Sequence, residues 1–222
     1  MIIPYAIETL EQEKPIANWI IIGACAVVFI VGLLPGSLTN NLVLDGLNPI
    51  GLIGHLFLHG SLIHLIGNMI FLWVFGNAIC SNTNNIIYPI LYLGVGISAA
   101  FIHLVFDGSP AIGASGAING ITGIVLAVYP TNRVRLIWFA IIRAGTTVAR
   151  AWIIITVWLL FDIIWLIIGA EGVAYWAHIG GLAAGVVIGL LCLQKGWILT
   201  TDADNKTLLE IIKGTKRGNT PR

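Results

Sequence analysis

Charged side chains are scarce in this sequence. Only 9% of its 222 residues are Asp, Glu, Lys or Arg, whereas 58% are hydrophobic, and the mean hydropathy is +0.95. A water-soluble globular domain carries roughly 25% charged residues, so this chain lacks the charge to coat a water-exposed surface. The composition predicts an integral membrane protein. The net charge of +1 and the lack of a basic stripe argue against a nucleic-acid partner.

Cysteines and cofactor-binding motifs are also sparse. Three cysteines lie in or beside apolar runs without the spacing of metal ligands: Cys25, Cys80 and Cys192. Such residues pack as small apolar side chains. A metal site built from His55, His59 and His64 is disfavoured, because no His-Glu-x-x-His motif is present and no neighbouring carboxylate would supply a general base. We therefore expect neither a metal nor a cofactor.

Six apolar segments approach the roughly 20 residues that cross a bilayer as a helix. They span residues 17–34, 61–80, 86–105, 115–130, 150–169 and 174–194. The fourth is short, so we expect its first residue, Ser115, to lie below the membrane surface. Residues 131–149 hold an apolar stretch, Leu136 to Ile142, that is too short to span and is expected to lie in the membrane interface. The predicted fold class is an all-α polytopic membrane protein with six transmembrane helices.

Lys and Arg are absent from the loops on one side of this predicted bundle. All eleven fall on the side of the N-terminus or at its boundary: Lys14, four arginines from Arg133 to Arg150, and six residues from Lys195 on. The positive-inside rule then places both termini in the cytoplasm. This divides the chain into a cytoplasmic segment (1–16), a membrane domain (17–195) and a cytoplasmic polar tail (196–222). The loops before Ser115 and His178 face outward.

Ser115 and His178 are polar residues inside apolar segments, where such groups are functional by default. A hydroxyl at a helix N-terminus suits a nucleophile that generates negative charge, and an imidazole can act as its general base. Both segments carry glycines at helical spacing: Gly116, Gly120 and Gly123, and Gly181, Gly185 and Gly189. Close packing of these faces would bring the two residues to one depth. Two alternatives stay open: a small residue at a packing face, and a histidine satisfied by a backbone carbonyl.

His64 and Asn68 lie four residues apart and so share one helical face. The asparagine amide offers two donors and the imidazole one or two. Donors directed at one point suit an oxyanion hole. The alternative is that these side chains only hold the helices together by hydrogen bonds.

Asp162 is the one acid within a predicted span, and it shares a face with an aromatic stripe formed by Trp158, Phe161 and Trp165. It could orient His178 as the third member of a triad, line a polar cavity, or bond to a neighbouring helix. We favour the last two roles. The sequence thus predicts a Ser115–His178 dyad in which packing holds the imidazole.

The chain closely resembles the rhomboid intramembrane serine proteases. The matching motifs occur in family order and at family spacing, from about residue 50 to 190: Phe57-Leu58-His59-Gly60, His64 with Asn68-Met69, Phe75-Gly76, Gly113-Ala114-Ser115-Gly116-Ala117, and Ala177-His178-x-Gly180-Gly181-x-x-x-Gly185. The opening Met1-Ile2-Ile3-Pro4 and Tyr129-Pro130 are similar to those of bacterial-type members. The resemblance implies a bacterial or archaeal plasma membrane.

The same resemblance implies a six-helix bundle with Ser115 as nucleophile, His178 as general base, and His64, Asn68 and the serine backbone N–H as the oxyanion hole. It also implies that the aromatic stripe (Trp158, Phe161, Trp165) and the following loop gate substrate entry. The chain departs from the family pattern in three places: at Asn119, at Cys80 where the family often has a glutamate, and in the long first loop, which lacks the tryptophan-arginine pair of some members. Asn119 stands where the best-studied members carry a tyrosine that stacks on the histidine.

The function that follows is intramembrane cleavage of single-pass transmembrane proteins near the outer membrane face. The partners implied are such substrates and the lipid bilayer. A catalytically inactive rhomboid-like protein that binds transmembrane helices is the alternative. A transporter is disfavoured, because we find neither internal repeats nor paired broken helices.

Overall fold

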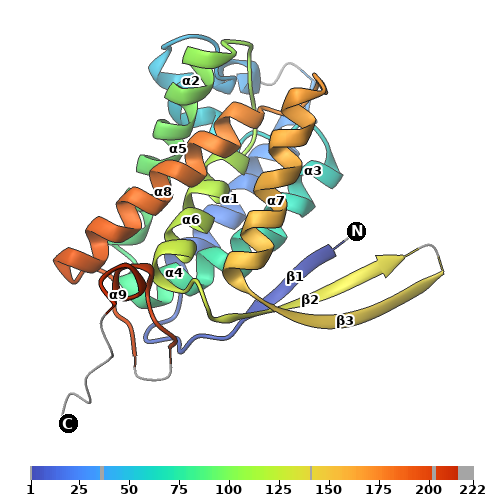
Figure 1. The fold of residues 1–222 in the computed structure, drawn as a ribbon. Coiled ribbons are helices and arrows are strands. Elements are labelled where there is room, and N and C mark those ends of the chain that lie inside the picture. Colours follow the sequence, from blue (N-terminus) through green and yellow to red (C-terminus); the bar gives the residue numbers. More distant parts are fainter. Residues whose placement is uncertain (1, 36–37, 141, 202–203, 215–222) are drawn as a thin grey trace.

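The computed structural model describes residues 2–35, 38–140, 142–201 and 204–214 (Figure 1). Helices form most of this part of the chain, and three strands form one small sheet. In chain order the elements are β1 (Ile2–Ile7), α1 (Ile16–Gly32), η1 (Leu38–Leu42), α2 (Pro49–Gly54), η2 (His55–Phe57), α3 (Leu62–Phe71), the π-helical turn η3 (Leu72–Gly76), α4 (Asn77–Thr83), α5 (Ile87–Phe106), α6 (Ser115–Val128), β2 (Arg133–Ala140), β3 (Arg143–Arg150), α7 (Ala151–Ile167), α8 (Tyr175–Lys195) and α9 (Leu208–Ile212).

Helices lie at all six of the predicted apolar segments. Three are long and apolar enough to cross a bilayer: Leu62–Thr83, which joins α3, η3 and α4, together with α5 and α8. The helices α1, α6 and α7 are apolar but shorter, with 17, 14 and 17 residues. The chain is therefore a mostly helical membrane protein, while crossing by the three shorter helices is still a prediction.

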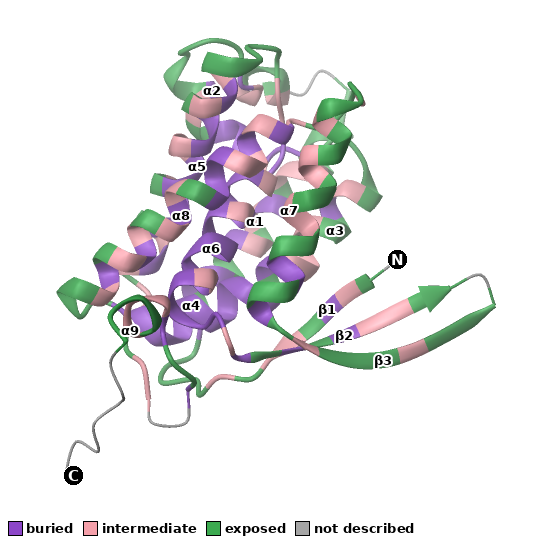
Figure 2. Ribbon diagram, in the orientation of Figure 1, coloured by how far each residue is buried: buried purple, intermediate pink, exposed green. Residues whose placement is uncertain are grey.

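Helix α6 forms the centre of the bundle, where most of its residues are buried (Figure 2). It packs against α8 with almost no side-chain volume between the two backbones. A Cβ added at Gly181 would collide with the carbonyl oxygen of Gly116, and one added at Gly185 would collide with that of Gly120. Small residues let two helices approach this closely. In lipid, where no hydrophobic effect drives helices together, such close van der Waals packing holds them in contact. The predicted contact between two glycine-lined faces is confirmed.

The all-α prediction is confirmed only in part: most of the described chain is helical, but the structure also contains a three-stranded antiparallel sheet in the order β1-β2-β3. Residues 136–140 of the predicted interfacial stretch belong to β2 of this sheet, whereas residue 141 lies outside the described residues. Val134 and Leu136 are buried, whereas Arg133 and Arg135 are exposed. Alternation with a period of two is the mark of a strand that is buried on one face. The mean hydropathy of this segment does not show the alternation, which is why hydropathy predicts no strand there.

The sheet, the N-terminal segment and the C-terminal segment meet at one end of the bundle (Figure 1). The Asp204 carboxylate accepts hydrogen bonds from the Thr9 hydroxyl at 3.0 Å and from the Asn132 amide at 3.2 Å. The Asn132 amide also donates to the carbonyl oxygen of Glu8 at 2.8 Å. These bonds tie three segments that are distant in the sequence. At the opposite end of the bundle, η1, α2 and η2 make the long first loop a structured connection.

Candidate functional site

One cavity of about 990 Å³ collects the predicted polar residues at the end of the bundle away from the sheet. Ser115 is the first residue of α6, and His178 lies in the first turn of α8. His64 and Asn68 reach the same cavity from α3. The connections between α5 and α6 and between α7 and α8 supply much of the remaining wall. Side chains from three segments that are far apart in the sequence therefore share one cavity.

The backbones that carry Ser115 and His178 touch directly beside these two residues. A Cβ added at Gly116 would lie 3.4 Å from the Cβ of Ala177. The same Cβ would lie 3.0 Å from the Cβ of Ala99 on α5, so residue 116 is confined between α5 and α8. Because Gly116 follows Ser115 and Ala177 precedes His178, the Gly116–Ala177 contact brings the starts of the two helices together at the cavity that both residues line.

Gly113 lets the His64 ring approach the start of α6. Its φ of +122° lies in a region that L side chains rarely adopt, and an added Cβ would lie 2.8 Å from two atoms of the His64 ring. Ser61 caps α3 by accepting a hydrogen bond from the backbone N–H of His64 at 3.1 Å, and the His59 ring lies edge-on to the His64 ring with the centroids 5.1 Å apart. His64 thus stands next to the helix N-terminus that bears Ser115.

His178 is held by a hydrogen bond as well as by packing. Its Nδ1 lies 3.1 Å from Oδ2 of Asp162 on α7, and the two side chains are 14% and 20% exposed. The Tyr175 ring also approaches the His178 ring edge-on, with the centroids 6.3 Å apart. The structure therefore joins Asp162 to an imidazole that we expected packing alone to hold.

Asn119 does not take over the place of the family tyrosine. Its amide donates to the carbonyl oxygen of Ser115, one turn earlier on the same helix, at 3.0 Å. This bond ties the asparagine amide to its own helix. The His178 ring instead contacts Asp162 on α7.

Asn68 has a partner that sequence reasoning missed. Its amide nitrogen lies 3.0 Å from Nε2 of His59, and His59 Nδ1 lies 3.3 Å from the carbonyl oxygen of Phe57. Burial and the neighbouring His64 lower the pKa of His59 to about 4, so its ring is neutral near pH 7. With Nδ1–H donating to Phe57, Nε2 accepts from the amide. One amide hydrogen of Asn68 is thereby fixed, and the second is available to the cavity.

The aromatic stripe divides between the bundle and its surface. The Trp158 ring packs on Phe71 and Phe75, with centroid distances of 4.7 and 6.0 Å. Phe161 and Trp165 are 53% and 48% exposed on the outside of α7. Trp158 therefore bridges α7 to the helix that carries His64 and Asn68, while the other two face the bundle's surroundings.

Potential metal ligands do not gather in the part of the chain that the structure describes, where no three His, Cys, Asp or Glu side chains are placed to hold an ion. The three cysteines are buried as free thiols.

Comparisons with known proteins agree with this architecture. The family model of the Rhomboid domain matches residues 47–195. RHOMBOID-like protein 6, mitochondrial, of Arabidopsis thaliana is 32% identical over 168 residues, which cover 73% of this chain and 50% of that protein. Presenilin-associated rhomboid-like protein A, mitochondrial, of Danio rerio is 29% identical over 59% of this chain and 34% of that protein.

A bacterial relative is also similar. Rhomboid protease GluP of Bacillus subtilis is 34% identical over 103 residues, which cover 44% of this chain and 19% of that protein. The chain thus spans half or less of the length of these curated relatives. The Rhomboid domain model matches most of the chain, including its motifs and its glycine-packed helices, and the chain therefore belongs to the rhomboid family.

Proposed function

We propose that this protein is an intramembrane serine endopeptidase that cleaves single-pass transmembrane proteins. The observation that carries the proposal is the shared cavity, which brings Ser115 and His178 together with His64 and Asn68. Family membership supports it, because the family includes a protein named as a protease. Neither residue of the proposed dyad is replaced in this chain.

In the proposed reaction, the unprotonated Nε2 of His178 takes the proton from the Ser115 hydroxyl as its oxygen attacks the scissile carbonyl carbon. The carbonyl oxygen becomes an oxyanion, which the Asn68 amide, the His64 ring and the Ser115 backbone N–H stabilise. The imidazolium then gives its proton to the leaving amine. Water hydrolyses the acyl-enzyme in a second, equivalent cycle.

The proposed topology has six crossings, with both termini in the cytoplasm of a bacterium or archaeon. It rests on the sequence positions of all eleven Lys and Arg, none of which falls in the loops before Ser115 and His178. The dyad then opens to the extracytoplasmic face, and its cavity provides the water that hydrolysis requires. The named relatives include mitochondrial and bacterial proteins, so the proposed compartment depends on the sequence pattern alone.

Substrate entry is proposed between α7 and α3, where Trp158 makes the contact with Phe71. The loop that follows α7 contains Gly169 and Gly172, both with positive φ, and it lines the cavity. Movement of this helix and loop would open the dyad to a transmembrane segment.

Labelling with a fluorophosphonate probe tests the proposal directly. The detergent-purified protein should be labelled and should cleave a model transmembrane substrate. Ser115→Ala should lose both properties, and His178→Ala should lose nearly all cleavage. The double variant should be no worse than either single variant, since the two groups act as one unit. A wild-type protein that binds transmembrane segments but shows neither labelling nor cleavage would instead establish a non-catalytic binder.

A further inference from the structure

Asp162 occupies an unfavourable place for a carboxylate. It lies on α7 among apolar and aromatic residues, its side chain is only 20% exposed, and the described residues place no Lys or Arg against it. Burial of an ionised carboxylate is costly unless a partner compensates it. The one polar partner that the structure gives it is Nδ1 of His178, at 3.1 Å.

This contact determines which nitrogen of His178 can act as the base. A carboxylate accepts but cannot donate when it is ionised, so Nδ1 must carry the hydrogen. Nε2, on the other side of the ring, then keeps its lone pair. Rotation of the ring would break the bond to Asp162, so the same contact fixes the orientation of the ring as well as its tautomer.

We infer that Asp162 is a positioning residue that completes a Ser115–His178–Asp162 triad, in place of a simple dyad. This inference rests on the proposed function. Asp162 touches neither substrate nor the reacting atoms. It holds the imidazole with Nε2 unprotonated before the attack, and its negative charge stabilises the imidazolium that forms when Ser115 gives up its proton. Asp162 does not itself take the proton.

The pH profile of cleavage separates positioning from a purely structural role. The other titratable groups on this cavity are His64, His103, Asp107, Glu171 and Tyr175. Their charges act on His178 in every variant. Replacement of Asp162 by asparagine removes only the counter-charge in contact with the imidazolium. The acid limb of the kcat/KM profile should therefore move to lower pH, because a higher proton concentration is needed to charge the ring.

The experiment compares Asp162→Asn with the control Asp107→Asn in the full chain. Asp107 lines the same cavity but accepts a hydrogen bond from the backbone N–H of Ser109 at 3.1 Å. For Asp162→Asn we expect kcat to fall by roughly 10- to 10³-fold, less than the roughly 10⁴-fold effect in soluble triads, with KM little changed. Asp162→Glu should recover part of the lost rate. The control should stay within about twofold of wild type at every pH.

The outcomes separate this inference from the proposed function. If wild type is labelled and active while Asp162→Asn keeps both its kcat and its acid limb, Asp162 is structural and the inference fails alone. The inference also fails if Asp162→Asn and Asp107→Asn shift the profile equally, because cavity charge would then explain the effect. A wild type without labelling or cleavage overturns the proposed function and this inference together.

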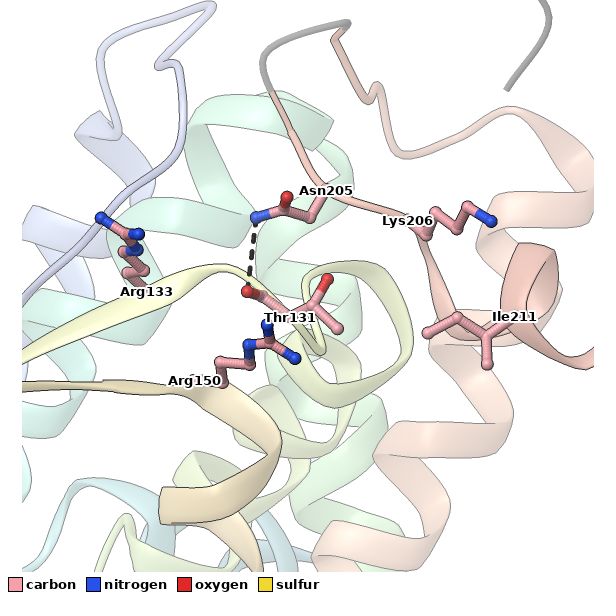
Figure 3. A pocket seen from close by; sticks show the side chains of 6 residues that line it. All are labelled: Thr131, Arg133, Arg150, Asn205, Lys206 and Ile211. Carbon is pink, nitrogen blue, oxygen red and sulfur yellow. Dashed lines mark hydrogen bonds between the residues drawn. The ribbon is translucent and has the colours of Figure 1, made fainter. Parts of the chain in front are cut away.

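A second inference concerns a smaller cavity of about 350 Å³ at the sheet end of the bundle (Figure 3). Of the six described residues that line it, three are cations and none is acidic. The lining is formed by Thr131, Arg133, Arg150, Asn205, Lys206 and Ile211. The amide of Asn205 donates to the carbonyl oxygen of Thr131 at 3.3 Å, which joins the C-terminal segment to the start of the hairpin.

The two arginines stand directly opposite each other in the β2–β3 register, as the pair Arg133 and Arg150. Like charges at such positions destabilise a sheet. In the described residues neither arginine nor Lys206 forms an ion pair, and the single ion pair of an arginine joins Arg135 to Glu8. This charge arrangement favours a negatively charged occupant.

We propose that this cavity binds a phosphate group, carried either by an anionic lipid or by a soluble phosphate. Guanidinium groups match phosphate oxygens in pairs of hydrogen bonds. The proposed topology places the cavity on the cytoplasmic side, where the leaflet is negatively charged. This proposal does not depend on protease activity.

The test uses the full chain in nanodiscs of zwitterionic lipid, with or without phosphatidylglycerol, and separately with inorganic phosphate. Wild type should gain thermal stability from one of these additions, and the addition that acts identifies the source. The double variant Arg133→Gln with Arg150→Gln should need a roughly tenfold or more higher concentration of the anion for the same gain in thermal stability. Arg143→Gln, at the hairpin tip, should respond like wild type. Without anions the double variant should be at least as stable as wild type. An undiminished response in the double variant, or no response in wild type, would overturn the proposal.

Discussion

Replacement of Gly185 by alanine should separate the two central helices. The added Cβ would lie inside van der Waals contact with the carbonyl oxygen of Gly120, and also 3.0 Å from the Gly120 Cα. Both are backbone atoms of α6, so no side chain can rotate away. The helices must move apart by on the order of 1 Å, which forfeits a quarter to a half of the dispersion energy of each affected contact.

Overpacking of this kind destabilises a protein by about 1–3 kcal/mol. Each kcal/mol corresponds to roughly 2–4 °C in the melting temperature of a domain of this size, so we expect a fall of about 2–12 °C. Cleavage should also fall, because Ser115 and His178 lie at the ends of the same two helices. The effect on activity should appear mainly in kcat.

Gly94→Ala is the matched control. Gly94 lies in α5 and is exposed, and an added Cβ there meets no atom within 4 Å. Alanine is favoured over glycine in a helix by roughly 0.5–1 kcal/mol, so this variant should be as stable as wild type or slightly more so. Thermal unfolding and substrate cleavage are measured on both variants in the same detergent. If Gly185→Ala melts and cleaves like Gly94→Ala, the close contact of α6 with α8 does not determine stability or activity.

Three further predictions follow from the site. Asn68→Ala should lower kcat by up to roughly 10²–10³-fold with a smaller effect on KM, and an unchanged kcat would make Asn68 structural. The low pKa of His59, about 4, means that unfolded chains bind more protons than folded ones between pH 4 and 6.5. The melting temperature should therefore fall as pH drops through that window, and it should fall less in His59→Gln than in wild type. Equal slopes of melting temperature against pH in the two proteins would refute this. Trp158→Ala should raise cleavage by loosening α7, because this ring packs on Phe71 and Phe75. Phe161→Ala with Trp165→Ala should have a smaller effect, since both side chains are half exposed on the outside of α7. Reduced cleavage together with lost probe labelling in Trp158→Ala would argue against gating.

The positions of the helices could be predicted because lipid requires long apolar runs, and all six predicted segments are helical. The shared cavity could also be anticipated. Ser115 and His178 each lie at the start of a glycine-lined helix, so packing of those faces brings them to one depth. Local sequence pattern and the close approach of backbones were sufficient for this part of the site.

The missed features depend on contacts between distant segments. The bond from Asp162 to His178 requires the rotation of α7 relative to α8, and a nearly uniform apolar helix such as α7 gives no signal for its rotation. The bond from Asn68 to His59 depends on the path of an irregular turn before α3. The sheet had a local signal in the alternation from Arg133 to Leu136, but its partner strand β1 lies more than a hundred residues earlier.

That separation has a consequence for biosynthesis. Ile3 of β1 pairs with Ile137 of β2, so the first strand leaves the ribosome long before its partner exists. At 5–20 residues per second, the interval is on the order of ten seconds, during which α1 to α6 are synthesised. An unpaired apolar strand is a template for aggregation. The nascent chain must therefore keep residues 2–7 shielded, at the membrane surface or by a chaperone, until the hairpin emerges and the sheet closes beneath the bundle.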